Sequence, residues 1–167
     1  MSPRVILVGA PGCGKTTVGL LLADRLGVTF RDTDADVEAL TGKAISELFV
    51  ERGEEYFRDL ESEAVRAAIS SHDGVLSLGG GAVMREETRD ALRGQHVVYL
   101  EVDAAEAARR VGLNTARPLL LGNVRGQLST LLQQRRAVYE SVATVTVNTV
   151  GRPADEVADA IAGELVA

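Results

Sequence analysis

Cysteine, lysine and long apolar runs are scarce in this chain of 167 residues. A single cysteine, Cys13, rules out an intrachain disulfide and favours a reducing compartment. The first twelve residues, MSPRVILVGAPG, contain one charged side chain and a short apolar run that ends in Pro-Gly. This pattern is typical neither of a signal peptide nor of a membrane span, which requires about 20 apolar residues. We therefore expect a cytoplasmic protein that does not bind a membrane.

Concentrated positive charge is also missing. The chain has 18 lysines and arginines against 24 aspartates and glutamates, a net charge of -6 at pH 7. Only Lys15 and Lys43 are lysines, and no segment concentrates arginine. A nucleic-acid-binding surface needs a basic patch that can displace counterions from phosphates. We therefore expect no nucleic-acid partner.

The length and the balance of residue types fit one folded domain over residues 1–167. Hydrophobic residues make up 46% of the chain and charged residues 25%, which is ordinary for a globular protein. We expect this domain to be a monomer. Glycine is the exception, because 17 glycines are present where average usage predicts about 12.

Apolar runs suited to buried strands alternate with segments of helical periodicity. This alternation predicts a three-layer α/β/α fold, with a parallel sheet between two layers of helices. The expected strands are 4–8, 29–32, 75–78, 96–101 and 143–147. The expected helices are 15–26, 34–40, 44–51, 54–71, 85–92, 104–111, 125–140 and 154–166. Residues 112–124 lack periodicity and predict a mobile segment, in which Arg117 is a candidate lid arginine.

A glycine-rich motif follows the first expected strand and begins the first expected helix. Residues 9–16, GAPGCGKT, match GxxxxGK[ST], a loop whose backbone N–H groups surround a phosphate. In such a loop Lys15 reaches the β- and γ-phosphates, and the Thr16 hydroxyl binds Mg²⁺. Cys13 occupies a variable position of the motif and needs no chemical role. The motif therefore predicts a nucleoside triphosphate site.

Two further groups follow expected strands at the same edge of the sheet. Asp32 and Asp34 end the second strand, where one carboxylate suits magnesium and the other a substrate hydroxyl; a helix cap is the alternative. The run of three glycines, Gly79, Gly80 and Gly81, leaves the backbone bare after the third strand, as a closely approaching ligand requires; a flexible turn is the alternative.

Two arginines differ from ordinary surface charges. Arg136 lies at the edge of the apolar stripe of its helix, and Arg58 lies three residues before Glu61, which can orient it. Each alone fits an ion pair within the protein, but two guanidinium groups together suit a carboxylate. Arg110 and Arg152 are candidate neighbours of the nucleotide, although Arg152 also fits the entrance of the last helix.

These motifs together resemble the shikimate kinase family, within the nucleoside monophosphate kinase-like group of P-loop proteins. The resemblance covers almost the whole chain and rests on GAPGCGKTTVG (9–19), DTDADVE (32–38), GEEYFRDLE (53–61), SLGGGAV (77–83), NTARPLL (114–120), RRAVYESVA (135–143) and NTVGRP (148–153). It implies transfer of the ATP γ-phosphate to the 3-hydroxyl of shikimate, on the route to chorismate and the aromatic amino acids. It also implies strand order 2-3-1-4-5, a substrate-binding region near 33–61 and a lid over 112–124.

The resemblance also implies a role for each matching residue. Catalysis would use Lys15, Asp34 and Arg117. Magnesium would be held by Thr16 and, through water, by Asp32. The ATP-binding residues would be Gly12, Cys13, Gly14, Lys15, Thr16, Thr17, Arg110, Arg117 and Arg152, with Arg152 against the adenine. The shikimate-binding residues would be Asp34, Arg58, Gly79, Gly80, Gly81 and Arg136.

Two other functions remain open at this point. A kinase of the same architecture that acts on another metabolite, such as gluconate, would share the phosphate loop and the lid. A regulatory nucleotide-binding module would share only the phosphate loop. A GTPase switch is disfavoured, because the chain has no [NT]KxD motif for reading guanine.

Overall fold

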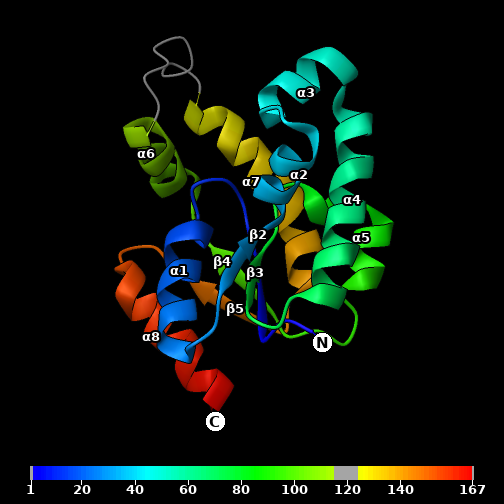
Figure 1. Cartoon of the computed structure of the whole chain (residues 1–167). Coiled ribbons are helices and arrows are strands. Elements are labelled where there is room, and N and C mark those ends of the chain that lie inside the picture. Colours follow the sequence, from blue (N-terminus) through cyan, green and yellow to red (C-terminus); the bar gives the residue numbers. More distant parts are fainter. Residues whose placement is uncertain (1, 115–123, 167) are drawn as a thin grey trace.

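Five parallel strands form one sheet in the computed structural model, which describes residues 2–114 and 124–166 (Figure 1). The strand order is β2-β3-β1-β4-β5, as the resemblance implied. All five expected strands are present, with shifts of one or two residues at their ends. They are β1 (Val5–Val8), β2 (Phe30–Asp32), β3 (Val75–Ser77), β4 (Val97–Glu101) and β5 (Val145–Asn148).

Helices cover both faces of this sheet and confirm the three-layer arrangement (Figure 1). One face packs against α1 (Lys15–Leu26) and α8 (Ala154–Val166), and the other against α4 (Glu54–Ser71), α5 (Glu86–Ala91) and α7 (Val124–Val142). Three further helices lie toward the end of the sheet where the strands terminate: α2 (Thr33–Thr41), α3 (Ile45–Arg52) and α6 (Ala104–Asn114). Over residues 2–114 and 124–166, no helix is both long and apolar enough to span a membrane.

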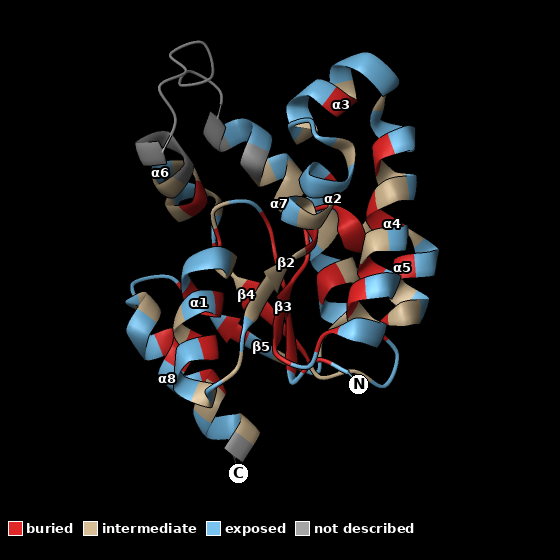
Figure 2. Ribbon diagram, viewed as in Figure 1, coloured by how far each residue is buried: buried red, intermediate tan, exposed pale blue. Residues whose placement is uncertain are grey.

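The core consists of two apolar layers, one on each face of the sheet. In β1, Val5 and Leu7 point into the layer beneath α1 and α8, whereas Ile6 and Val8 point into the layer beneath α4 and α7. All four are at most 1% exposed, so the strand is buried on both faces (Figure 2). This double burial explains why β1 is a continuous apolar run rather than an alternating one.

The structure differs from the expected elements in two places. A 3-10 helix, η1 (Ala82–Met84), precedes α5, and its three residues are too few to produce a helical pattern in the sequence. Helix α6 continues to Asn114 and helix α7 begins at Val124, so the expectation of an aperiodic segment was wrong for residues 112–114 and 124. The rest of the expected lid, residues 115–123 with Arg117, lies outside the described residues.

Two helical glycines give opposite predictions for the same substitution. Alanine normally stabilises a helix relative to glycine by about 1 kcal/mol. At Gly19 in α1, however, an added Cβ would lie 2.3 Å from the Phe30 ring, whereas at Gly163 in α8 nothing lies within 4 Å. We expect Gly19→Ala to lower the free energy of unfolding by about 1 to 3 kcal/mol and Gly163→Ala to raise it slightly, as measured by urea denaturation. Equal effects of the two substitutions would contradict this packing.

Candidate active site

The phosphate-binding motif forms the turn between β1 and α1. Gly14 is the N-cap of α1 with φ 93°, a left-handed conformation that favours glycine. The Lys15 ammonium donates to the carbonyl oxygens of Gly9 at 2.6 Å and Ala10 at 3.4 Å. The loop therefore wraps around the lysine at the N-terminus of a helix, where the helix dipole favours an anion.

A cavity of about 340 Å³ brings the predicted motifs together at the carboxyl-terminal edge of the sheet. Because parallel strands end at the same edge, the residues that follow β1, β2 and β3 meet there although they are far apart in the sequence. From the expected site, its lining includes Gly12, Gly14, Lys15, Thr16, Thr17, Asp32, Asp34, Gly79 and Gly80.

The two aspartates have different surroundings in this cavity. Asp32 caps α2, accepting a hydrogen bond from the backbone N–H of Asp34 at 2.9 Å, so the alternative of a helix cap holds for this residue. Asp34 does not cap the helix, because its Oδ1 atom is buried and has no hydrogen-bond partner among the described residues. An unpaired buried acceptor beside a cavity suits a donor supplied by a ligand.

The pKa of Asp34 is raised to about 6, chiefly by burial and also by the negative charges of Asp32 and Glu61. Lys15 and Arg58 oppose this rise without cancelling it. Burial also raises the pKa of Asp32 and of Glu61. A carboxyl group with a pKa near neutrality, inside a polar cleft, is suited to accept a proton from a bound molecule.

The three glycines after β3 allow side chains to approach the backbone closely. A Cβ at Gly79 would lie 2.5 Å from Asp34 Oδ1 and 2.7 Å from Glu61 Oε2. A Cβ at Gly81 would lie 2.4 Å from Arg58 Nη2. Acidic and basic side chains of α2 and α4 therefore pack directly on this stretch of main chain, and a Cβ at Gly79 or Gly81 would force the end of a side chain to move.

Acidic side chains and aromatic rings hold Arg58 beside the backbone of Gly81. Its Nη1 atom donates to Glu61 Oε1 at 2.7 Å, as the spacing of three residues predicted, and a weaker pair joins Nη2 to Glu54 at 3.4 Å. The guanidinium carbon lies 5.2 Å from the ring centre of Phe57 and 5.9 Å from that of Phe49. With only 14% of its side chain exposed, Arg58 is a positioned cation rather than a surface charge.

A second cavity, of about 370 Å³, adjoins the other side of the phosphate loop. Its wall is formed by α1, α6 and α8 and by the segments that follow β1 and β5. The expected site residues in this wall are Cys13, Gly14, Thr17, Arg110 and Arg152. The Cys13 thiol is buried and free, 3.6 Å from the Lys15 ammonium. Arg152 pairs with Glu156 at 3.3 Å and also donates to Asn148 O, so it is both a wall residue and a contact at the entrance of α8.

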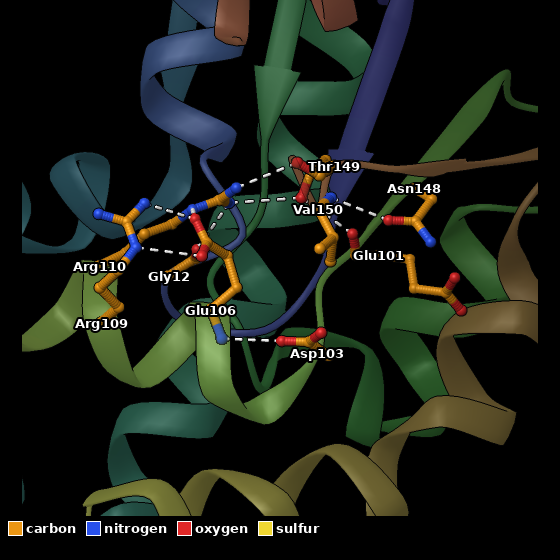
Figure 3. Close-up of polar contacts among 9 residues, drawn as sticks. All are labelled: Gly12, Glu101, Asp103, Glu106, Arg109, Arg110, Asn148, Thr149 and Val150. Atoms are coloured by element: carbon orange, nitrogen blue, oxygen red, sulfur yellow. Dashed lines mark hydrogen bonds and ion pairs between the residues drawn. The ribbon is translucent and has the colours of Figure 1, made fainter. Parts of the chain in front are cut away.

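Arg110 connects three parts of this second cavity (Figure 3). It donates to Gly12 O at 3.1 Å and to Thr149 O at 3.1 Å, and its Nε atom pairs with Glu106 at 3.0 Å. Hydrogen bonds from Arg109 and Arg110 lower the pKa of Glu106 to about 2, because together they outweigh the opposite effect of desolvation on this pKa. The phosphate loop, β5 and α6 are therefore joined through one guanidinium group.

Comparison with known proteins agrees with this combination of motifs. A family model described as shikimate kinase matches residues 11–166. The chain belongs to the shikimate kinase family. It is 57% identical to the shikimate kinase of Salinispora arenicola over 167 residues, with 100% of both chains covered. The solved shikimate kinase from Acinetobacter baumannii in complex with shikimate has a TM-score of 0.91 at 34% identity, covering 99% of this chain and 93% of that one.

The fold by itself extends beyond the shikimate kinase family. A gluconokinase from Sinorhizobium meliloti has a TM-score of 0.60 with this chain at 21% identity, over 97% of this chain and 90% of that one. At this identity the likeness shows the fold alone. The assignment to shikimate kinases therefore rests on the family model and on the more similar relatives.

Arg136, which the family resemblance had suggested for the shikimate site, is not brought to the Asp34 cavity. Its side chain is 64% exposed and pairs with Glu140 at 2.8 Å and with Glu101 at 3.4 Å. It lines a different cavity, between α7 and the ends of β4 and β5. The prediction failed because Arg136 lies on the edge of the apolar face of α7, turned toward β4.

Arg135, which the sequence analysis did not name, lies on the apolar face of α7, whereas Arg136 lies at its edge. Burial raises the pKa of Glu61 and of Tyr139, and the positive charge of Arg135 opposes both rises. Arg135 is also half buried, and it lies in the middle of the helical face formed by Leu131, Leu132, Val138, Tyr139 and Val142. Its spacing of four residues to the buried Tyr139 is the signal that could have identified it.

Tyr139 and Glu61 are two further residues near the glycine run that the sequence analysis did not predict as site residues. The Tyr139 hydroxyl donates to Gly80 O, which fixes the middle of the glycine run to α7. Glu61 is 1% exposed and presents one oxygen to Arg58, while its Oε2 atom is buried without a partner. The sequence analysis predicted Glu61 as the partner of Arg58. Its oxygen beside Gly79, which has no partner among the described residues, was identified only from the folded structure.

Ionisation of the Asp34 carboxyl group should lower the free energy of unfolding of the protein. Because its pKa of about 6 exceeds the ordinary value of 3.8, the folded state holds this proton more tightly than the unfolded chain, and stability falls as pH rises through this window. We expect Asp34→Asn to raise the free energy of unfolding at pH 8 by about 1 to 3 kcal/mol. The gain should shrink as pH falls toward 4, as measured by urea denaturation.

The exposed Asp24 provides the control for this measurement. Asp24→Asn should change the free energy of unfolding little at either pH. A gain for Asp34→Asn that is the same at both pH values would mean that the burial of Asp34 is not the cause.

Proposed function

We propose that this chain transfers the γ-phosphate of ATP to the 3-hydroxyl of shikimate, releasing shikimate 3-phosphate and ADP. The observation that carries the proposal is the unpaired Asp34 Oδ1 atom, which shares a cavity with Lys15 of the phosphate loop. Membership of the shikimate kinase family supports the same reaction. The shikimate in the Acinetobacter baumannii structure supports the choice of acceptor.

The phosphate end of ATP would bind the loop between β1 and α1. Backbone N–H groups around Gly12 and Gly14 and the ammonium of Lys15 would carry the charge of the β- and γ-phosphates. In the structure, the Lys15 ammonium donates hydrogen bonds to the carbonyl oxygens of Gly9 and Ala10. On binding ATP, it would exchange these hydrogen bonds for contacts with phosphate oxygens. The cavity lined by Arg110 and Arg152 would take the nucleoside end.

Shikimate would bind between Asp34 and the basic side chains of α4 and α7. Arg58 and Arg135 would bind its carboxylate, because two guanidinium groups can form charge-assisted hydrogen bonds with a planar anion. Gly79 and Gly80, which line the cavity, would lie beside the ring, whereas Gly81 packs against Arg58. Arg135 replaces Arg136 in this proposal for the reasons of exposure and pairing given above.

Positioning and charge stabilisation should dominate catalysis, since phosphoryl transfer passes through a loose transition state. The 3-hydroxyl oxygen forms a bond to the γ-phosphorus while the bond to the leaving oxygen of ADP breaks. The hydroxyl proton passes to the ionised Asp34, which also orients the oxygen for attack. Lys15 stabilises the charge on the transferring group, and Arg117, outside the described residues, is proposed to do so from the lid.

Magnesium is proposed as the metal that accompanies ATP. Thr16 and Asp32 supply a hydroxyl and a carboxylate oxygen in the same cavity, the donor type that Mg²⁺ prefers. Thr16 would bind the ion directly and Asp32 through water. Within the described parts of the chain no group of three or more His, Cys, Asp or Glu side chains could hold a metal, so the nucleotide itself would complete this site.

The proposal includes one folded unit over residues 1–167 that acts as a monomer in the cytoplasm. The binding residues from the ends of β1, β2 and β3 meet in one cavity, which supports a single unit. Light scattering on the purified protein tests the monomer. The cytoplasmic assignment rests on the single cysteine.

ADP release with ATP and magnesium should depend on shikimate. We expect turnover to rise by at least about 100-fold when shikimate is added, because the acceptor hydroxyl is positioned while water is not. A coupled assay for ADP measures this. Removing magnesium with a chelator should abolish the signal.

Gluconate serves as the alternative acceptor in the same assay. Turnover with gluconate but not with shikimate would overturn the proposal in favour of another metabolite kinase. ATP hydrolysis that no acceptor changes would favour a regulatory module.

The neighbouring arginines of α7 provide a matched pair of substitutions. We expect Arg135→Ala to raise the dissociation constant for shikimate by about 10- to 100-fold, because a charge-assisted contact is lost. Arg136→Ala should change it by less than about 3-fold, since its exposed pairs contribute little. Isothermal titration with shikimate and, separately, with ATP measures both constants. The opposite order of effects would restore Arg136 to the site.

A further inference from the structure

Two arginines that do not line the Asp34 cavity form hydrogen bonds around the loop after β3. The loop runs through Gly79, Gly80 and Gly81 into the 3-10 helix η1, which is closed by hydrogen bonds from Ala82 N to Gly79 O and from Met84 N to Gly81 O, both at 3.1 Å. Neither Arg85 nor Arg89, which follow η1, lines the cavity that contains Asp34.

Arg89 satisfies the carbonyl groups at the end of η1. Its Nη1 atom donates to Val83 O at 2.9 Å and to Met84 O at 2.8 Å. These carbonyls end a helical turn and have no partner further along it. One half-buried guanidinium from α5 therefore fixes the end of the loop.

Arg85 joins the same loop to α4. Its Nη1 atom donates to Asp59 Oδ1 at 2.9 Å, and its Nη2 atom donates to Glu55 O at 3.2 Å. Asp59 directly follows Arg58, the cation that packs on the backbone of Gly81. The distance between α4 and the loop is thus set from two sides, by Arg58 against Gly81 on one and by Arg85 with Asp59 on the other.

We propose that Arg85 and Arg89 are positioning residues that hold the loop of residues 79–84 against α4, so that the glycine backbone and Arg58 are correctly spaced for the acceptor. This inference rests on the proposed function, in which shikimate binds this loop and Arg58. The nucleotide binds the loop between β1 and α1 and the wall formed by α6 and β5. Loosening the loop of residues 79–84 should therefore weaken acceptor binding selectively.

The first test compares steady-state constants of Arg85→Ala and Arg89→Ala with the wild type. We expect KM for shikimate to rise by about 3- to 10-fold in each variant, the range for partly exposed pairs and charge-assisted hydrogen bonds. KM for ATP should stay within about 2-fold. Arg93→Ala is the control, because Arg93 is 82% exposed and, within the described residues, pairs only with Asp90. It should change neither constant.

The exchanged pair Asp59→Arg with Arg85→Asp tests the contact itself. Each single substitution should raise KM for shikimate, and the double variant should recover at least half of the loss, because the ion pair is restored in reverse. Unchanged constants in Arg85→Ala and Arg89→Ala, or equal rises for shikimate and ATP, would overturn the inference.

Hydrogen exchange separates this inference from the proposed function. Without ligands, the backbone amides of Ala82 and Met84 should exchange at least about 3-fold faster in Arg85→Ala and Arg89→Ala than in wild type or Arg93→Ala. Wild-type turnover that does not depend on shikimate would refute the proposed function alone. Unchanged exchange of these two amides would refute the support of the loop.

Discussion

The position of β1 between β3 and β4 is the constraint on which the rest of the structure depends. Parallel pairing on both sides, with Leu7 opposite Ser77 and Val98, brings the ends of neighbouring strands to one edge. The phosphate loop follows β1, the glycine run follows β3, and Asp34 follows β2, which pairs with β3. Burial of β1 on both faces holds it in the interior of the sheet, and its ladders to β3 and β4 define the register.

Charge inside the site is balanced locally rather than by the whole molecule. The chain carries a net charge of -6, and both proposed substrates are anions. In the proposed function, their binding would depend on a few positioned cations, chiefly Lys15, Arg58 and Arg135. Burial, together with the negative charges of Asp32 and Glu61, raises the pKa of Asp34 to about 6. Its carboxylate is therefore a stronger base than that of an ordinary aspartate and is still mostly ionised near neutral pH.

Local patterns predicted the elements of the fold more accurately than the directions of side chains. The phosphate loop was identified because its motif has a fixed length between a strand and a helix, and helix α1 begins and ends where expected. The glycine run was assigned to ligand approach, whereas the structure shows Asp34, Glu61 and Arg58 packed on it. The prediction that Arg136 lies at the shikimate site was wrong. Side chains of adjacent helical residues point about 100° apart, so an error of one residue changes the surface that a side chain contacts.

The sequence by itself determined the sheet, its helices, the nucleotide loop and the family, because each depends on periodicity or on residues adjacent in the chain. Only the tertiary structure decided that Arg136 pairs with Glu140 and lines a cavity other than that of Asp34, and that Arg85 reaches Asp59 on α4. It also revealed the unpaired oxygens of Asp34 and Glu61. These features arise where distant segments pack together, and burial and pairing there depend on neighbours that the sequence does not specify locally.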